Sequence, residues 1–204
     1  MKRRRYPTDL SDDEWRCICA HLPEPTGWGR PRLHSLRAIL DAVFYVLKSG
    51  CPWRLLLPRD FPPWKTVYDS FRRWRIDGTW KRLNAELRER LRWHLGRNPN
   101  PSAGIVDSQS VKTTGVGGKE RGFDPAAEKV EGTKRHLLVD TEGLVLGARV
   151  HSARVHDEDG IKLLLESARI ELSRLKHLWV DAGYRGRGAA ASSASMLAPI
   201  HPTA

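Results

Sequence analysis

The spacing of apolar residues divides the chain into a helical first half and a strand-rich second half. In four segments before residue 98, apolar side chains recur every three or four positions, as an amphipathic helix requires. These four stripes are Trp15, Ile18, Cys19 and Leu22; Leu36, Ile39, Leu40, Val43, Val46 and Leu47; Trp64, Val67, Phe71 and Trp74; and Trp80, Leu83, Leu87, Leu91 and Leu95.

Residues that begin or end helices lie where these stripes require them. Residues 11–14 (Ser-Asp-Asp-Glu) form the pattern of a capping box, and Gly50 and Gly96 follow apolar stripes at positions suited to a helix end. Four prolines between residues 51 and 63 predict a loop. We therefore expect an all-α domain over residues 1–97.

A different pattern begins after residues 98–103, a proline- and asparagine-containing segment that we interpret as a linker. Short apolar runs predict strands, and one apolar stripe predicts a helix between the last two strands. The strands are Ile105–Val106, His136–Val139, Leu144–Val150 and Leu178–Val180, and the helical stripe is Ile161, Leu164, Leu165 and Ala168. This order predicts an α/β domain over residues 104–187, with a loop over Gly115–Glu131.

The final segment, residues 188–204, resembles neither half. It has six alanines and three serines but no Asp, Glu, Lys or Arg. Its composition predicts a low-complexity tail unrelated to the preceding domain.

Charge is unevenly distributed along the chain. The net charge is +11, of which residues 1–99 carry +10 (21 Lys and Arg against 11 Asp and Glu). A basic half joined to a near-neutral half favours nucleic-acid binding, and the alternative is a generally basic protein. No apolar run is long enough to span a membrane, and the three cysteines lack metal-site spacing. We therefore expect a cytoplasmic, nucleoid-associated protein without membrane contact.

Two aspartates follow strand-like runs and are candidate metal ligands. Asp107 ends Ile105–Val106, and Asp181 ends Leu178–Val180. Carboxylates at strand ends suit a hard divalent cation that meets phosphate, although aspartates at such positions are also common in surface turns. Asp140 also follows a strand, but the next residues, Thr-Glu-Gly, predict an ordinary turn. We interpret His151, His156 and Asp157 as structural because their spacing matches no strong metal motif.

Basic residues provide candidate contacts to DNA. In the third helical segment, cations alternate with an aromatic stripe, so one face can pack while the other meets phosphates. The candidates are Lys65, Arg72, Arg73 and Arg75 on this helix, Arg30 and Arg32 in a glycine- and proline-containing loop, and Lys112, Lys134 and Arg135 near the predicted strands. For all of them the alternative is a solvated charged surface.

Seven blocks of sequence resemble the DDE transposases of bacterial insertion sequences, in the branch named for insertion sequence five. The blocks are residues 6–10 (YPTDL), 29–32 (GRPR), 45–54 (YVLKSGCPWR), 61–68 (FPPWKTVY), 107–114 (DSQSVKTT), 134–141 (KRHLLVDT) and 181–186 (DAGYRG). They span about residues 6–187 in the family's order. The resemblance implies that the second half is a ribonuclease H-like domain, with Asp107 and Asp181 as its first and second catalytic acids.

The resemblance also implies cofactors and partners. Mg²⁺ or Mn²⁺ would be held by Asp107 and Asp181, and double-stranded DNA would be bound as terminal inverted repeats and as target. Two further partners are left open: a second copy of the chain in a homodimer, and the product of a frameshifted downstream reading frame.

The family's third acid is a glutamate well downstream of the second, but no glutamate follows Glu171 here. We therefore expect a partial catalytic domain, apparently truncated or frameshifted, and two hypotheses stay open. The chain is a transposase that cuts and joins DNA, or a catalytically incomplete DNA-binding product that represses transposition.

Overall fold

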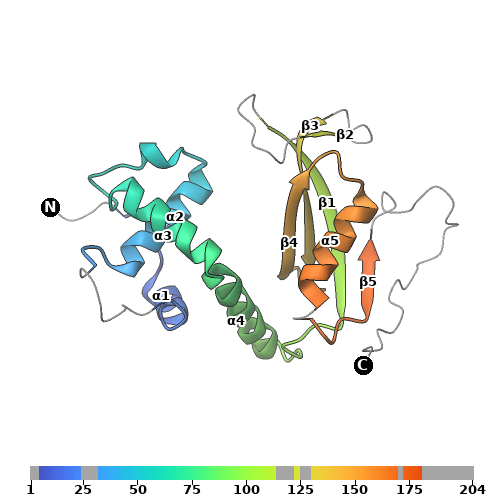
Figure 1. Ribbon diagram of the computed structural model, residues 1–204. Helices are drawn as coiled ribbons and strands as arrows, with labels where there is room; N and C mark the ends of the chain where they lie inside the picture. The colour runs from blue at the N-terminus through green and yellow to red at the C-terminus, as the bar shows by residue number, and fades with distance from the viewer. Residues whose placement is uncertain (1–4, 24–31, 114–121, 125–129, 170–171, 181–204) are drawn as a thin grey trace, which may run out of the picture. The chain divides into compact units, whose positions relative to one another are not determined.

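The computed structural model describes residues 5–23, 32–113, 122–124, 130–169 and 172–180 (Figure 1). The chain divides into two compact units, Met1–Leu87 and Arg88–Ala204. Each unit has its own hydrophobic core.

Helices make up the first unit, as the apolar stripes predict. They are α1 (Asp12–Cys19), α2 (Leu36–Ser49), the 3₁₀ helix η1 (Trp53–Leu55), α3 (Trp64–Ile76) and α4 (Thr79–His94), the last of which continues into the second unit. Ser11 and Glu14 form the predicted capping box, and Gly50 ends α2 with a φ of 68°. The prediction of a loop over residues 51–63 was wrong for η1, which forms because Leu55 and Leu56 donate to carbonyls three residues earlier.

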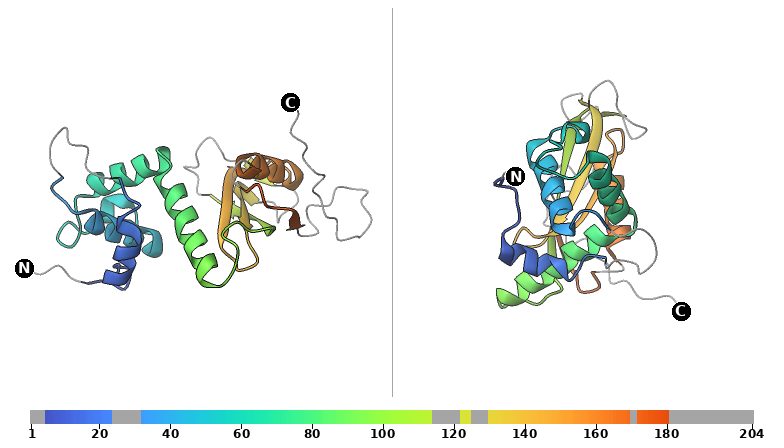
Figure 2. Two further views of the ribbon diagram at one scale, coloured as in Figure 1. Left: turned by 90° about the horizontal axis from the view of Figure 1, so that it is seen from below. Right: turned by 90° about the vertical axis from the view of Figure 1, so that its left-hand side faces the viewer.

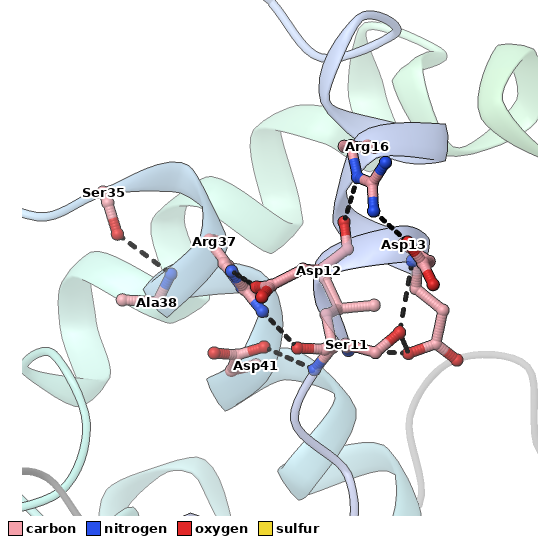
Figure 3. A network of polar contacts seen from close by, with 10 residues as sticks. Ser11, Asp12, Asp13, Arg16, Ser35, Arg37, Ala38 and Asp41 are labelled. Atoms are coloured by element: carbon pink, nitrogen blue, oxygen red, sulfur yellow. Dashed lines mark hydrogen bonds and ion pairs between the residues drawn. The ribbon is translucent and has the colours of Figure 1, made fainter.

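The segment before α1 is fixed to the first turns of α2 by hydrogen bonds (Figure 3). The buried carboxylate of Asp41 accepts the backbone N–H of Leu10 at 2.9 Å. Arg37 donates to the carbonyl of Leu10 at 2.6 Å and to the carboxylate of Asp12 at 2.6 Å. The bond from Leu10 compensates for the burial of Asp41, which would be costly without a partner.

Two apolar clusters form the interior of the first unit. One joins α1, α2, α3 and α4 around Leu40 and Trp74. The other packs α2 against η1 and α3 around Val43 and Val67, both fully buried. α3 contributes to both clusters, so one side of this helix is fixed against the core and the other side faces outward.

A five-stranded mixed sheet forms the second unit. The strands are β1 (Ala103–Lys112), β2 (Gly122–Asp124), β3 (Val130–Val139), β4 (Val145–Ser152) and β5 (His177–Val180), with α5 (Asp157–Arg169) between the last two. β3 pairs antiparallel with β1, β2 and β4, whereas β5 pairs parallel with β1.

Two predictions about this sheet were wrong. β1 does not end at Val106 but continues through Asp107 to Lys112, because its polar half pairs with β3 as far as Gly132. β2 and the start of β3 lie in the predicted loop Gly115–Glu131, where they pair with each other. Residues 114–121 and 125–129 of that loop lie outside the described residues.

α5 lies along one face of the sheet, as the turned view in Figure 2 shows. Leu164 of α5 is fully buried against Val106 of β1 and Leu138 of β3. Because side chains alternate between the faces of a strand, residues 105, 107 and 109 of β1 lie on the face away from α5.

The last turns of α4 belong to the second unit. Arg92 is buried and pairs with the fully buried Asp140, whose carboxylate also accepts the N–H groups of Glu142 and Leu144. Arg88, also buried, donates to the carbonyl of Val145. These contacts hold the last turns of α4 to the β3–β4 turn, and the division between the two compact units falls within α4.

Candidate functional site

Asp107 lies in the middle of β1 and is exposed on the face opposite α5. Its neighbours two residues away on the same face, Ile105 and Gln109, are also exposed. We had expected Asp107 to end a strand, but β1 continues for five residues beyond it. The carboxylate is held in the interior of a paired strand, where the backbone has little freedom.

The described register between β1 and β5 stops one residue before the two candidate acids. Val106 and Val180 are partners in this parallel pair, and they directly precede Asp107 and Asp181 in the sequence. Asp181 itself lies outside the described residues.

Polar and apolar side chains surround Asp107 on this open face. Leu137 of β3 is its register partner and is 37% exposed. Two register pairs further along, on the same face, Arg135 donates to the side-chain carbonyl of Gln109 at 2.7 Å. In the other direction, Ile105 pairs with Trp179 of β5, which is 51% exposed. A cation held by a neighbouring amide and an exposed aromatic ring thus lie on the sheet face that carries the acid.

The opposite face buries a polar cluster beneath α5. Lys134 is 4% exposed, and its ammonium lies 3.0 Å from the carboxylate of Asp157. His136 is fully buried, and its ring stacks on that of His151 with centroids 4.8 Å apart. We had predicted that Lys134 contacts DNA, but β3 turns this side chain inward, where it forms an ion pair.

Burial changes the acid–base behaviour of His136. Burial, and after it the electrostatic effect of His151, lowers the pKa of the imidazole to about 4. Asp157 opposes this shift, but the neutral ring is favoured. Among the described residues, no group of three or more His, Cys, Asp or Glu side chains is placed to hold a metal.

α3 presents cations outward from a buried aromatic and aliphatic side. Val67 and Trp74 are buried, whereas Lys65 and the arginines at positions 72, 73 and 75 are exposed. In the part of the chain that the structure describes, none of these four cations forms an ion pair.

Sequence reasoning missed two residues beside these cations. The guanidinium of Arg54 lies 4.8 Å from the ring centre of Trp64 at the start of α3. Tyr68 packs edge-on against Trp53 with centroids 5.5 Å apart and is 38% exposed. Tyr68 follows Lys65 by three residues and precedes Arg72 by four, which is a signal of a shared helix face.

The remaining candidate DNA contacts are scattered. Arg32 is exposed and donates to the carbonyl of Pro23 at 3.3 Å, and Arg30 lies outside the described residues. Lys112 is exposed at the end of β1.

Comparisons with known proteins show which family the chain belongs to. Residues 10–84 match the model of a transposase of the IS4/5 family, and residues 98–196 match the transposase DDE domain. The uncharacterized 16.2 kDa protein of insertion element IS402 from Burkholderia cepacia is 32% identical over 120 residues, which cover 54% of this chain and 77% of that protein. The chain belongs to the DDE transposases of insertion sequences. No solved structure matches it.

The two family models match different regions of this DDE transposase. The first match lies in the helical unit, and the second contains the sheet that carries Asp107. The second match extends to residue 196, into the alanine- and serine-rich segment. The family cleaves and transfers DNA strands and generally uses divalent metal ions. Within the described residues, no helix is long and apolar enough to cross a membrane.

Proposed function

We propose that this transposase binds the terminal inverted repeats of its element through the helical unit. We further propose that Asp107 and Asp181 serve as two acids of a metal-dependent site for strand cleavage and transfer. The position of Asp107 carries this proposal: an exposed carboxylate in the middle of a paired strand, one residue past the last described β1–β5 pair. The three antiparallel strands, the helix and the parallel return of β5 support a ribonuclease H-like assignment for this unit.

The carboxylates of Asp107 and Asp181 would hold Mg²⁺ or Mn²⁺. Exposed oxygen ligands on a rigid sheet suit such hard cations, which keep positions open for water and phosphate. A bound divalent ion would stabilise negative charge on the attacking and leaving oxygens of an in-line displacement. Within this chain, β1 fixes the carboxylate of Asp107, and Gln109 orients the guanidinium of Arg135 on the same face, where it can bind a substrate phosphate.

DNA binding by the helical unit rests on its charge. The unpaired outward cations of α3 suit a phosphate backbone, and Arg54 extends the basic surface at the start of the helix. Arg30, Arg32 and Lys112 are further candidates for phosphate contacts.

Metal binding tests the role of the acids. The full chain should bind Mn²⁺ weakly, and either Asp107→Asn or Asp181→Asn should lower the affinity, because each removes one charged ligand. Asp159→Asn, an exposed acid on α5, is a matched control that should bind as the unchanged chain does. Binding unaffected by both site substitutions would contradict the shared site.

A second candidate function is DNA binding without catalysis, as in a repressor of transposition. It is favoured by one observation: residues 1–99 hold +10 of the net charge of +11, which suits binding to DNA and requires no catalysis. Incubation of the 204-residue polypeptide with DNA that contains the element's ends, with Mg²⁺ present, separates the two functions. Metal-dependent strand transfer would support the first function and exclude the second, whereas binding without strand transfer would support the second.

A further inference from the structure

The outward face of α3 carries one acid among its cations. Asp69 follows Lys65 by four residues and precedes Arg72 by three and Arg73 by four. At 3.6 residues per turn, Lys65, Asp69 and Arg72 lie on the side of the helix opposite the buried Val67 and Trp74. All three side chains are exposed.

A helix acid with arginines three and four residues later is ordinarily explained as one half of an exposed ion pair. α1 closes such a pair, between Asp13 and Arg16 (Figure 3). Among the described residues, Asp69 forms no ion pair with Lys65, Arg72 or Arg73. The carboxylate is therefore available to an outside partner at the centre of the basic face.

An acid at this position opposes binding to phosphates, since it repels them. Base edges are different, because the major groove of DNA presents amino groups as well as acceptors, and a carboxylate accepts from N4 of cytosine. α3 has 13 residues and is about 20 Å long at 1.5 Å per residue, which suits a helix lying in the major groove.

We propose that α3 enters the major groove and that Asp69 determines base specificity by accepting a hydrogen bond from a cytosine amino group. Lys65 and Arg72, one turn to either side, would contact the flanking phosphates or guanines. Tyr68, held against Trp53, would provide an apolar contact beside them. This inference rests on the proposed binding of DNA by the helical unit.

The test selects duplexes from a library with a randomised core, using the full 204-residue chain. The selected duplex and a mixed-sequence duplex are then compared by fluorescence anisotropy at one fixed salt concentration. Asp69→Ala should lower the ratio of the two affinities about tenfold, while affinity for the mixed duplex stays equal or rises. Asp69→Asn should move the selected base at one position from cytosine to adenine, because an amide pairs with adenine.

Glu86→Ala is the matched control, since it removes an exposed acid of the same unit from α4. Its affinity ratio should equal that of the unchanged chain. An unchanged ratio for Asp69→Ala, an unchanged base preference for Asp69→Asn, or an equal loss in Glu86→Ala would overturn the inference. Binding by the unchanged chain without any base preference would contradict this inference alone, whereas no binding to any duplex would contradict the proposed function as well.

Discussion

Lys134 and Arg135 are neighbours in the sequence and carry the same charge, yet β3 turns them to opposite faces of the sheet. Lys134 is buried and pairs with Asp157, while Arg135 is exposed beside Gln109. The sequence could not separate them, because the four residues that follow (His-Leu-Leu-Val) do not alternate between polar and apolar. Only the pairing of β3 with β1 and β4 determines which face is covered.

The buried imidazole of His136 predicts a dependence of stability on pH. Its pKa is lowered to about 4 by burial first and then by His151, with Lys134 acting in the same direction and Asp157 and Asp107 opposing. An unfolded histidine titrates near 6.5, so acidification protonates the unfolded chain first and favours unfolding. The contribution is complete above about pH 6.5 and is lost as the pH falls toward about 4.

We expect His136→Gln to remove this part of the acid sensitivity, about 2 kcal/mol between these two pH values. Urea unfolding at a series of pH values measures it. His156→Gln removes an exposed histidine and should keep the pH profile of the unchanged chain. Parallel profiles for His136→Gln and the unchanged chain would show that His136 is not the group responsible.

Gly160 shows how closely α5 approaches β3. A Cβ atom added there would lie 2.2 Å from the Nε2 atom of His136. A glycine-to-alanine change within a helix normally stabilises it by about 1 kcal/mol, so a destabilising effect would be specific to this contact.

We expect Gly160→Ala to lower the unfolding free energy by about 2 kcal/mol, because α5 must move away from the sheet. Gly147→Ala is a suitable control, since its added Cβ would meet only Leu164 at 3.6 Å. Thermal unfolding of both variants checks the prediction. A Gly160→Ala protein that is as stable as the unchanged chain would mean that α5 is less tightly packed than described.

At the scale of elements, helices were easier to predict than strands. The first four helices are specified locally, by stripes and end residues such as Ser11 and Gly50. β1 and β2 depend on partners that are distant in the sequence. The polar residues of β1 up to Lys112 form a strand because β3 pairs with them, and these residues show no alternation of apolar and polar side chains that would predict a strand. Asp107 could therefore be proposed as an acid from the sequence, but its place within β1 could not be predicted.

The attachment of α4 to the β3–β4 turn also escaped sequence reasoning, because arginines on a helix usually face solvent. Its central contact is the buried ion pair between Arg92 and Asp140. Removing one partner of such a pair leaves a charge buried without compensation.

We expect Asp140→Asn to destabilise the protein by about 3–5 kcal/mol, because the amide can still accept the turn N–H groups but cannot neutralise Arg92. Glu142→Gln is the control, since its partner Arg97 is 57% exposed and the change should cost less than about 1 kcal/mol. Urea unfolding compares the two variants. Equal effects would indicate that the Arg92 pair is no more important than a surface pair.

At the scale of the whole molecule, the two units differ in net charge and in the candidate sites that they carry. The first unit, residues 1–87, holds +7 of the net +11 (17 Lys and Arg against 10 Asp and Glu), and the second unit holds the remaining +4. The second unit also holds the acid of the candidate site, where more positive charge would weaken the binding of a divalent cation. Attraction to DNA should therefore come mainly from the helical unit. It should depend steeply on salt, because each phosphate that the protein neutralises releases condensed counterions.

The last prediction concerns this salt dependence. Neutralising Arg72, Arg73 and Arg75 together to Gln should weaken binding of the full chain to duplex DNA. It should also flatten the plot of log affinity against log salt, by about 0.9 for each phosphate that the variant no longer neutralises. The same reduction in charge at the exposed arginines 90, 149 and 154 of the second unit is the control and should change the slope less. Fluorescence anisotropy across a salt series measures both, and equal slopes for the two triple variants would mean that overall charge, rather than α3, attracts the DNA.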